Sequence, residues 1–172
     1  MVRALFPGTF DPIHYGHIDI ADRAMRLFDE LVVAVYDKPL KSLMFSPQER
    51  IKLVQKTFKG REKIKVIGYS GLTVDVCRKI DAQVIVRGLR VFSDFEFEFR
   101  MALANHRLSA DIEMVALITA EEHTFLSSST VREIAMLGGD VSSMVPPQVE
   151  VALKNKVSKL GEHLLPPNAL RD

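Results

Sequence analysis

The sequence is poor in the features that mark secreted, membrane-spanning or nucleic-acid-binding chains. It has one cysteine in 172 residues, Cys77, which excludes an internal disulfide. Its formal net charge is only +1, so the chain as a whole carries no electrostatic footprint for nucleic acid. The apolar runs are too short to span a bilayer, and the first residues lack the layout of a signal peptide. We therefore expect a cytoplasmic protein with no nucleic-acid partner and no membrane partner.

Several catalytic signatures are also missing. Neither the GxGxxG pattern of dinucleotide-binding proteins nor the GxxxxGK[ST] pattern of P-loop proteins follows the first apolar run, which disfavours both classes. His14 and His17 form an HxxH pair, but there is no HExxH pattern and Cys77 is distant, so the ligand count for zinc is poor. We expect no metal site made by protein ligands.

The chain does contain a regular alternation of short apolar runs with amphipathic segments. The runs are continuous and rich in Val, Ile and Leu, which is typical of strands buried on both faces of a parallel sheet. They cover residues 2–6, 31–36, 64–68, 84–87 and 114–119. Between the first two runs, Ala21, Ala24, Met25 and Phe28 recur at helical spacing and form one apolar face.

Three further helices are indicated by local signals. Ser46, Pro47 and Glu49 have the spacing of an N-cap, a first-turn proline and a capping-box partner. A helical run over residues 131–137 stops at two glycines, a common helix end. A last helix is expected near residues 146–159.

The segment DFEFEF, residues 94–99, is ambiguous. Its strict alternation favours a strand. Against this, Ser93 and Glu96 have capping-box spacing, and the apolar residues that follow continue at helical spacing. We predict a helix here.

The order of elements is then strand and helix repeated five times, with one more helix near the end. This favours an α/β fold, a doubly wound, Rossmann-like, five-stranded parallel sheet with helices on both faces. We assign residues 1–159 to a single domain. Residues 160–172 contain paired prolines and no periodicity, and we expect them to form a loosely ordered C-terminal tail.

The loop after the first strand is the first place to look for a site, because ligands of such sheets bind beyond the carboxyl ends of the strands. Gly8 would let a ligand approach the backbone, and Thr9 offers a hydroxyl and an N–H group. Gly16 and His17 stand where the next helix should begin, and free N–H groups there favour an anion. His17 could donate a hydrogen bond to a phosphate, but from this loop alone it could equally be a helix cap.

Four motifs carry a resemblance to a known family. GTFDPIHYGH, residues 8–17, resembles the opening signature of the nucleotidyltransferase superfamily, (His or Thr)-x-Gly-His, and LSSSTVRE, residues 126–133, resembles its second signature. Between them, KPLKSLMFSPQER and VIVRGLRVFSDFEFEFRMALAN are similar to the phosphopantetheine adenylyltransferases of coenzyme A biosynthesis. The motifs keep their order and spacing, and the resemblance covers about residues 2–158.

The resemblance implies a reaction in which ATP and 4′-phosphopantetheine give dephospho-coenzyme A and pyrophosphate. The acceptor phosphate is already largely dianionic at pH 7, since its second pKa is about 6, so no general base is needed. Catalysis should then consist of positioning and charge stabilisation, with direct in-line attack and no covalent enzyme intermediate. The alternatives are another nucleotidyltransferase of the superfamily, acting on nicotinate mononucleotide or a phosphorylated alcohol, and a non-catalytic nucleotide-sensing module.

The resemblance also implies which residues form the site. Its catalytic residues correspond to His17, Lys41 and Arg90, of which His17 contacts an ATP phosphate and Lys41 holds the acceptor phosphate. Acceptor binding falls to Thr9, Lys41, Thr73 and Arg87. ATP binding falls to Thr9, Phe10, His17, Gly88, Leu89, Arg90, Glu98, His123, Thr124, Phe125, Leu126, Ser127, Ser128 and Ser129.

Some of these positions have a plainer interpretation or depart from the family. Ser127 to Ser129 precede a helix expected to begin near Thr130, where Thr130 and Glu133 have capping-box spacing. His14 stands where many relatives have Thr, and His106 stands where relatives mostly have Arg. The resemblance further implies Mg²⁺, bound mainly through the ATP phosphates, and a homo-oligomer, specifically a hexamer.

Overall fold

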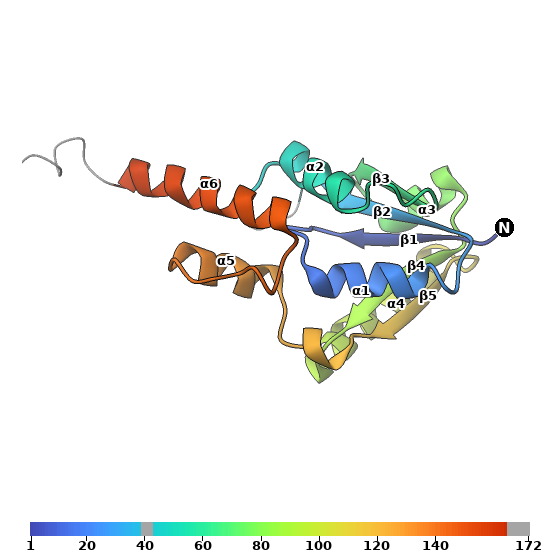
Figure 1. The fold of residues 1–172 in the computed structure, drawn as a ribbon. Helices are drawn as coiled ribbons and strands as arrows, with labels where there is room; N and C mark the ends of the chain where they lie inside the picture. The colour runs from blue at the N-terminus through green and yellow to red at the C-terminus, as the bar shows by residue number, and fades with distance from the viewer. Residues whose placement is uncertain (39–42, 165–172) are drawn as a thin grey trace, which may run out of the picture.

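The computed structural model describes residues 1–38 and 43–164, with side chains as far as residue 160. At its centre lies a sheet of five parallel strands in the order β3-β2-β1-β4-β5 (Figure 1). The strands are β1 (Arg3–Gly8), β2 (Glu30–Tyr36), β3 (Ile64–Tyr69), β4 (Val84–Leu89) and β5 (Glu113–Ile118). All five apolar runs are strands, which confirms the predicted Rossmann-like α/β fold.

Helices cover both faces of this sheet. The helices over the faces are α1 (Tyr15–Ala24), α2 (Pro47–Thr57), α3 (Thr73–Ile80) and α4 (Phe92–Leu108), and the chain continues with α5 (Ser128–Met136) and α6 (Pro147–Leu164). Ala4 and Phe6 of β1 pack in the core with α1 and α2, whereas Leu5 packs with α3 on the other side, because successive side chains of a strand point to opposite faces. No helix in the described ranges is long and apolar enough to cross a membrane.

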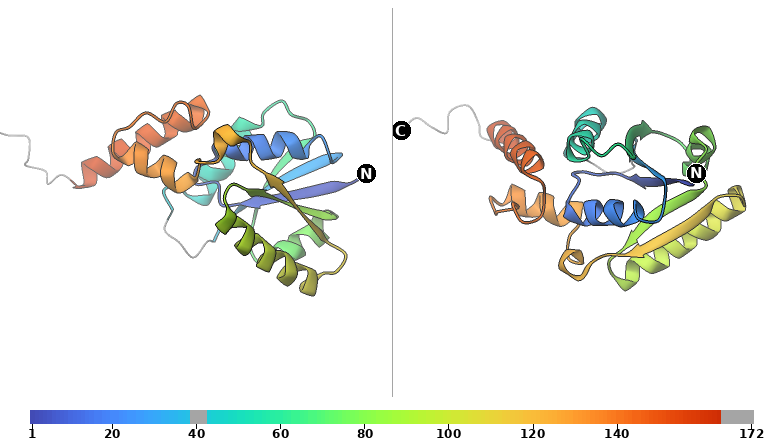
Figure 2. Two further views of the ribbon diagram at one scale, coloured as in Figure 1. Left: turned by 90° about the horizontal axis from the view of Figure 1, so that it is seen from below. Right: turned by 45° about the vertical axis from the view of Figure 1, so that its right-hand side comes forward.

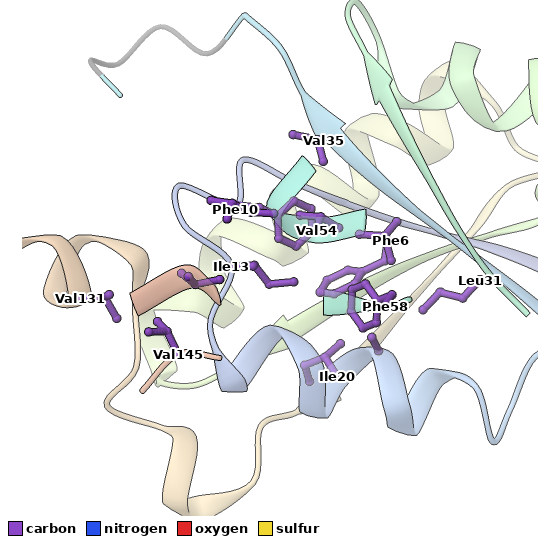
Figure 3. Packing of buried hydrophobic residues seen from close by; sticks show 14 of the residues in the cluster. Phe6, Phe10, Ile13, Ile20, Leu31, Val35, Val54, Phe58, Val131 and Val145 are labelled. Carbon is purple, nitrogen blue, oxygen red and sulfur yellow. The ribbon is translucent and has the colours of Figure 1, made fainter. Parts of the chain in front are cut away.

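The core on the α1 and α2 side extends beyond the sheet. Figure 3 shows Phe6, Phe10 and Ile13 leading from β1 toward Val131 and Val145 of the C-terminal part. α5 and α6 pack together there, beyond the carboxyl ends of the strands (Figures 1 and 2). The first loop therefore lies between the sheet and the C-terminal helices.

The start of α2 follows the local prediction. Ser46 Oγ accepts the N–H of Glu49 at 3.3 Å, and Glu49 Oε2 accepts the N–H of Ser46 at 2.7 Å. This capping box satisfies two donors that the first turn of a helix otherwise leaves without partners.

Two other helix starts were predicted wrongly. Residues 94–99 are helical as expected, but α4 begins at Phe92, so Ser93 lies inside the helix and forms no capping box with Glu96. The acidic side chain that forms a hydrogen bond with the backbone before this helix is that of Asp94, which accepts the N–H of Arg90 at 3.0 Å. Likewise α5 begins at Ser128, and its N-cap is Ser127 in place of Thr130.

The C-terminal helix is longer than expected. α6 runs to Leu164, past the predicted end at Lys159 and into the segment that we assigned to a loose tail. Residues 165–172, the rest of the predicted tail, lie outside the described residues.

Candidate active site

A cavity of about 300 Å³ opens at the carboxyl ends of β1 and β4. These strands are neighbours, but the chain leaves them in opposite directions, toward β2 and toward β5. Such a switch in strand order leaves a crevice that ligands of α/β sheets commonly occupy. Of the predicted site residues, it is lined by Thr9, Phe10, His17, Arg87, Gly88, Arg90, Glu98, Ser127, Ser128 and Ser129.

A second cavity, of about 440 Å³, lies on the other side of the same wall. Thr73, at the start of α3, lines it together with Tyr36 and Tyr69. The two cavities share five lining residues, Pro7, Gly8, Thr9, Arg87 and Glu98. The predicted acceptor residues Thr9, Thr73 and Arg87 thus meet in the second cavity, and most predicted ATP residues meet in the first.

The two histidines of the first loop are stacked, with ring centroids 3.7 Å apart. The backbone N–H of His14 donates to Nδ1 of His17 at 3.2 Å. A neutral His17 must then carry its proton on Nε2, which makes Nε2 a hydrogen-bond donor. His17 lines the cavity, so this donor is available to an anionic ligand.

The electrostatic surroundings keep both rings neutral. Burial lowers the pKa of His17 well below its ordinary value, and the nearby His14, Arg90 and Arg87 lower it further. Burial, with Arg90 and His123, lowers the pKa of His14 to about 3. Nδ1 of His14 is buried and has no hydrogen-bond partner among the described residues.

Two glycines let the rings pack this closely. A Cβ on Gly16 would lie 3.1 Å from the ring of His14, and a Cβ on Gly8 would lie 2.9 Å from the ring of Phe10. Phe10 has a φ of 50° and is almost fully buried, with its ring centroid 4.9 Å from that of His17. The ring of Phe10 therefore packs against the ring of His17 and holds it in place. We had predicted that Phe10 binds ATP.

Both predicted arginines are held by carboxylates of α4. Arg87 donates to both carboxylate oxygens of Glu98, at 2.9 and 2.5 Å, and to the carbonyl of Pro7. Arg90 donates to both oxygens of Asp94, at 3.1 and 3.2 Å, and to the carbonyl of Leu126. Burial alone would raise the pKa of Asp94, but the hydrogen bonds from Arg90 keep it below its ordinary value.

The first turn of α5 forms the far wall of the cavity. Ser127 Oγ accepts the N–H of Thr130 at 3.0 Å, so this hydroxyl caps the helix. Ser128 Oγ donates to the carbonyl of Pro12 at 2.9 Å, and Arg132 pairs with the carboxylate of Asp11 at 3.2 Å. These contacts fix the N-terminus of α5, where free N–H groups favour an anion, against the histidine loop.

Some predicted residues lie elsewhere. Leu89, His123, Thr124, Phe125 and Leu126 do not line the cavity. The side chain of Leu126 is buried in the core, whereas that of Phe125 is 59% exposed. Lys41 lies outside the described residues.

The cavity also contains residues that the sequence analysis missed. Asp94 stands four residues after Arg90, and opposite charges at so short a separation, on either side of a predicted helix start, could have indicated an ion pair. Thr119 follows β5 directly, and a polar residue at the carboxyl end of a predicted strand is a recognisable signal.

Comparison with known proteins identifies a family model and several similar proteins. A family model described as cytidylyltransferase-like matches residues 5–134. Phosphopantetheine adenylyltransferases from Roseiflexus sp. (strain RS-1) and Roseiflexus castenholzii are each 51% identical over 154 residues, which is 90% of this chain and 96% of theirs. One from Gloeobacter violaceus is 49% identical over 153 residues, 89% of this chain and 95% of its own.

A solved structure shares the fold at low sequence identity. It is a Vibrio parahaemolyticus protein described as a nicotinate-nucleotide adenylyltransferase, with a TM-score of 0.68 at 22% identity, covering 90% of this chain and 100% of that one.

The fold and the matched motifs define a nucleotidyltransferase of the cytidylyltransferase-like class. Within that class, the chain belongs to the phosphopantetheine adenylyltransferase family.

Proposed function

We propose that this protein transfers the adenylyl group of ATP to 4′-phosphopantetheine, giving dephospho-coenzyme A and pyrophosphate. Two cavities that share one wall carry this proposal, because the reaction must bring two large anionic substrates together at one point. The nucleotide occupies the cavity that contains His17 and the start of α5. The acceptor occupies the cavity that contains Thr73, and its phosphate reaches the shared wall at Thr9 and Arg87.

The chemical step needs charge stabilisation more than proton transfer. The acceptor phosphate attacks as an anion, and negative charge develops on the α-phosphate and on the leaving pyrophosphate. Nε2–H of His17 donates to that charge, and the guanidinium of Arg90 adds a positive potential. Because a neutral His17 has its other nitrogen engaged by a backbone N–H, its donor needs no reorientation during the reaction.

The adenylyl group passes directly to the acceptor in this proposal. His17 is neutral and donates through Nε2, so it suits a stabilising role better than a nucleophilic one. A chiral α-thiophosphate analogue of ATP should show inversion at the α-phosphorus, as one in-line displacement requires. Retention, or an adenylylated His17 trapped with labelled ATP alone, would demonstrate a two-step route.

The proposal includes Mg²⁺, which would bind together with ATP. The carboxylates among the described cavity residues, Asp94 and Glu98, are both paired with arginines, and the described part of the chain offers no group of three metal-ligating side chains. The residues present therefore suit an ion that is held by phosphate oxygens and water. Bound in that way, Mg²⁺ would neutralise charge on the phosphates.

Self-association is also part of the proposal, and α4 supplies the surface. Its outer face consists of Phe92, Phe95, Phe99 and Leu103, which recur at helical spacing and are 87%, 50%, 52% and 58% exposed. Apolar patches of this kind commonly mark protein–protein contacts. We assign this outer face of α4 to contact between copies of the chain, in a hexamer as the family resemblance implies, and we place the enzyme in the cytoplasm.

The decisive experiment is pyrophosphate release with ATP, Mg²⁺ and a panel of acceptors. We expect release with 4′-phosphopantetheine and none when the acceptor is omitted. Preference for nicotinate mononucleotide would assign the chain to another branch of the superfamily. Tight ATP binding without pyrophosphate release from any acceptor would indicate a nucleotide-sensing module instead.

A further inference from the structure

Arg50, in the first turn of α2, is a fully buried charge close to the site. Its side chain has 0% exposure, and it lines neither of the two substrate cavities. Burying a guanidinium is costly unless its donors are satisfied. The role of Arg50 can therefore be inferred from the groups that its side chain contacts.

Within the described part of the chain, its hydrogen bonds go to backbone carbonyls. Nη1 donates to the carbonyls of Thr9 at 2.7 Å and Tyr36 at 2.6 Å, Nε donates to that of Phe45 at 3.3 Å, and Nη2 reaches that of Asp37 at 3.5 Å. Burial lowers the pKa of Arg50, whereas the charges of Asp11 and Asp37 act in the opposite direction.

These carbonyls belong to three segments, of which the sheet joins two, because β1 pairs with β2, and leaves the third, before α2, unattached. Thr9 follows β1, Tyr36 ends β2, and Phe45 immediately precedes the N-cap of α2. A second buried charge ties two of these segments, the loop after β1 and the residues before α2, since Asp11 accepts the N–H groups of Met44 and Phe45, both at 2.9 Å. The planar fork of a guanidinium can hold several carbonyls in fixed directions, which an ammonium group cannot do.

Two of the segments held by Arg50 line the substrate cavities. Thr9 lies in the shared wall, and Tyr36 lines the acceptor cavity. We propose that Arg50 is a positioning residue for adenylyl transfer, which fixes the backbone at Thr9 and Tyr36 and so sets the alignment of the acceptor phosphate with ATP. This inference rests on the proposed function.

A positioning role has a distinct kinetic signature. Arg50 touches neither cavity, so each substrate should still bind when it is replaced. The reacting groups would meet in a poorer alignment, and a displacement of about 1 Å can cost roughly 10²-fold in rate. Loss of Arg50 should therefore lower kcat while the Kd of each substrate measured alone is unchanged.

The test compares Arg50→Lys and Arg50→Gln with Arg3→Lys as a matched control. Arg3 lies at the opposite end of β1, is partly buried, and binds the carboxylate of Glu30 and the carbonyl of Ile80. Calorimetry gives the Kd of ATP and of 4′-phosphopantetheine separately, and pyrophosphate release gives kcat at a temperature at which circular dichroism shows each variant folded.

We expect both Arg50 variants to lose at least about tenfold in kcat with unchanged Kd values, and Arg3→Lys to lose thermal stability but keep kcat. Normal turnover by a folded Arg50→Lys protein would overturn the inference, and so would a kcat loss matched by Arg3→Lys. If neither Arg50 variant folds, the residue is structural and the inference fails. A wild-type chain that releases no pyrophosphate would overturn the proposed function as well, so the two failures are distinguishable.

Discussion

At the scale of single residues, the chemistry depends on which nitrogen of His17 carries the proton. Sequence motifs can indicate that a histidine is present at the site, but the hydrogen bond from the backbone of His14 determines its tautomer. Burial and nearby positive charge keep the ring neutral, so it acts as a donor without carrying a charge of its own.

Replacements of His17 should distinguish the contribution of the Nε2 donor from that of the imidazole ring. His17→Ala removes the Nε2 donor and should reduce kcat by roughly 10²–10³-fold, as the loss of one transition-state donor does. His17→Gln places an amide donor near the position of Nε2 and should retain more activity than His17→Asn, whose amide is shorter. Pyrophosphate release by the folded variants is the measurement, and near-normal turnover of His17→Ala would contradict the assigned role.

The neutral histidines should also make stability depend on pH. The pKa of His14 is about 3 in the folded chain and about 6.5 when unfolded, so between these values the unfolded state binds the extra proton. Its contribution to stability is present above pH 6.5 and is lost as the pH falls toward 3. The slope should approach about 1.4 kcal/mol per pH unit for a histidine of this kind.

Urea unfolding at several pH values between about 5 and 6.5, where most carboxylates are still ionised, would measure this slope. His14→Gln should reduce it. An equal slope in wild type and variant would mean that His14 binds protons equally in the folded and unfolded chain, and that folding does not lower its pKa.

At the scale of elements, helix ends carry much of the site. At the start of α5, three adjacent serines make different hydrogen bonds and therefore have different roles. Ser127 caps the helix and Ser128 donates to the carbonyl of Pro12, while Ser129 accepts a weak hydrogen bond from Arg132 and donates its hydroxyl proton to none of the described residues.

These contacts predict that replacing Ser128 affects stability and that replacing Ser129 affects ATP binding. Ser128→Ala loses its hydrogen bond to Pro12 and should lower the free energy of unfolding by about 1 kcal/mol, with little change in the Kd for ATP. Ser129→Ala should weaken ATP binding with little change in stability. Thermal unfolding and calorimetry on both variants check this, and a larger loss of ATP affinity in Ser128→Ala would reverse the assignment.

At the scale of the whole molecule, α4 connects the site with the surface. Its inner side presents Asp94 and Glu98 to the arginines of the cavity, and its outer face presents Phe92, Phe95 and Phe99 to solvent. A contact between copies through the outer face would therefore bury the apolar side of the helix that holds both arginines.

Charges on this outer face should break the assembly. Phe95→Lys combined with Phe99→Lys introduces like charges on an apolar surface, and light scattering after size exclusion should show a smaller particle with normal circular dichroism. Leu137→Lys is the control, because Leu137 is an apolar side chain with 83% exposure outside α4. An unchanged mass for the double variant would exclude this face as the contact.

The sequence by itself determined the order of the elements and the type of chemistry. Continuous apolar runs such as residues 31–36 are typical of strands buried on both faces, and this pattern was enough to predict a parallel sheet. The motifs around His17 and Arg90 were enough for the family, because they keep their spacing along the chain. Helix starts at Phe92 and Ser128 were less predictable, because several residues nearby can cap a helix and tertiary contacts select among them.

Only the tertiary structure decided which residues act together. The pair Arg87–Glu98, the hydrogen bond from Arg90 to the carbonyl of Leu126, and the burial of Arg50 beside Thr9 all depend on where separate segments meet in space. Local sequence encodes backbone preference and apolar periodicity, because both arise from a residue and its near neighbours. Hydrogen-bond partners and burial arise from packing between segments that lie far apart in the chain, so they become visible only once the chain has folded.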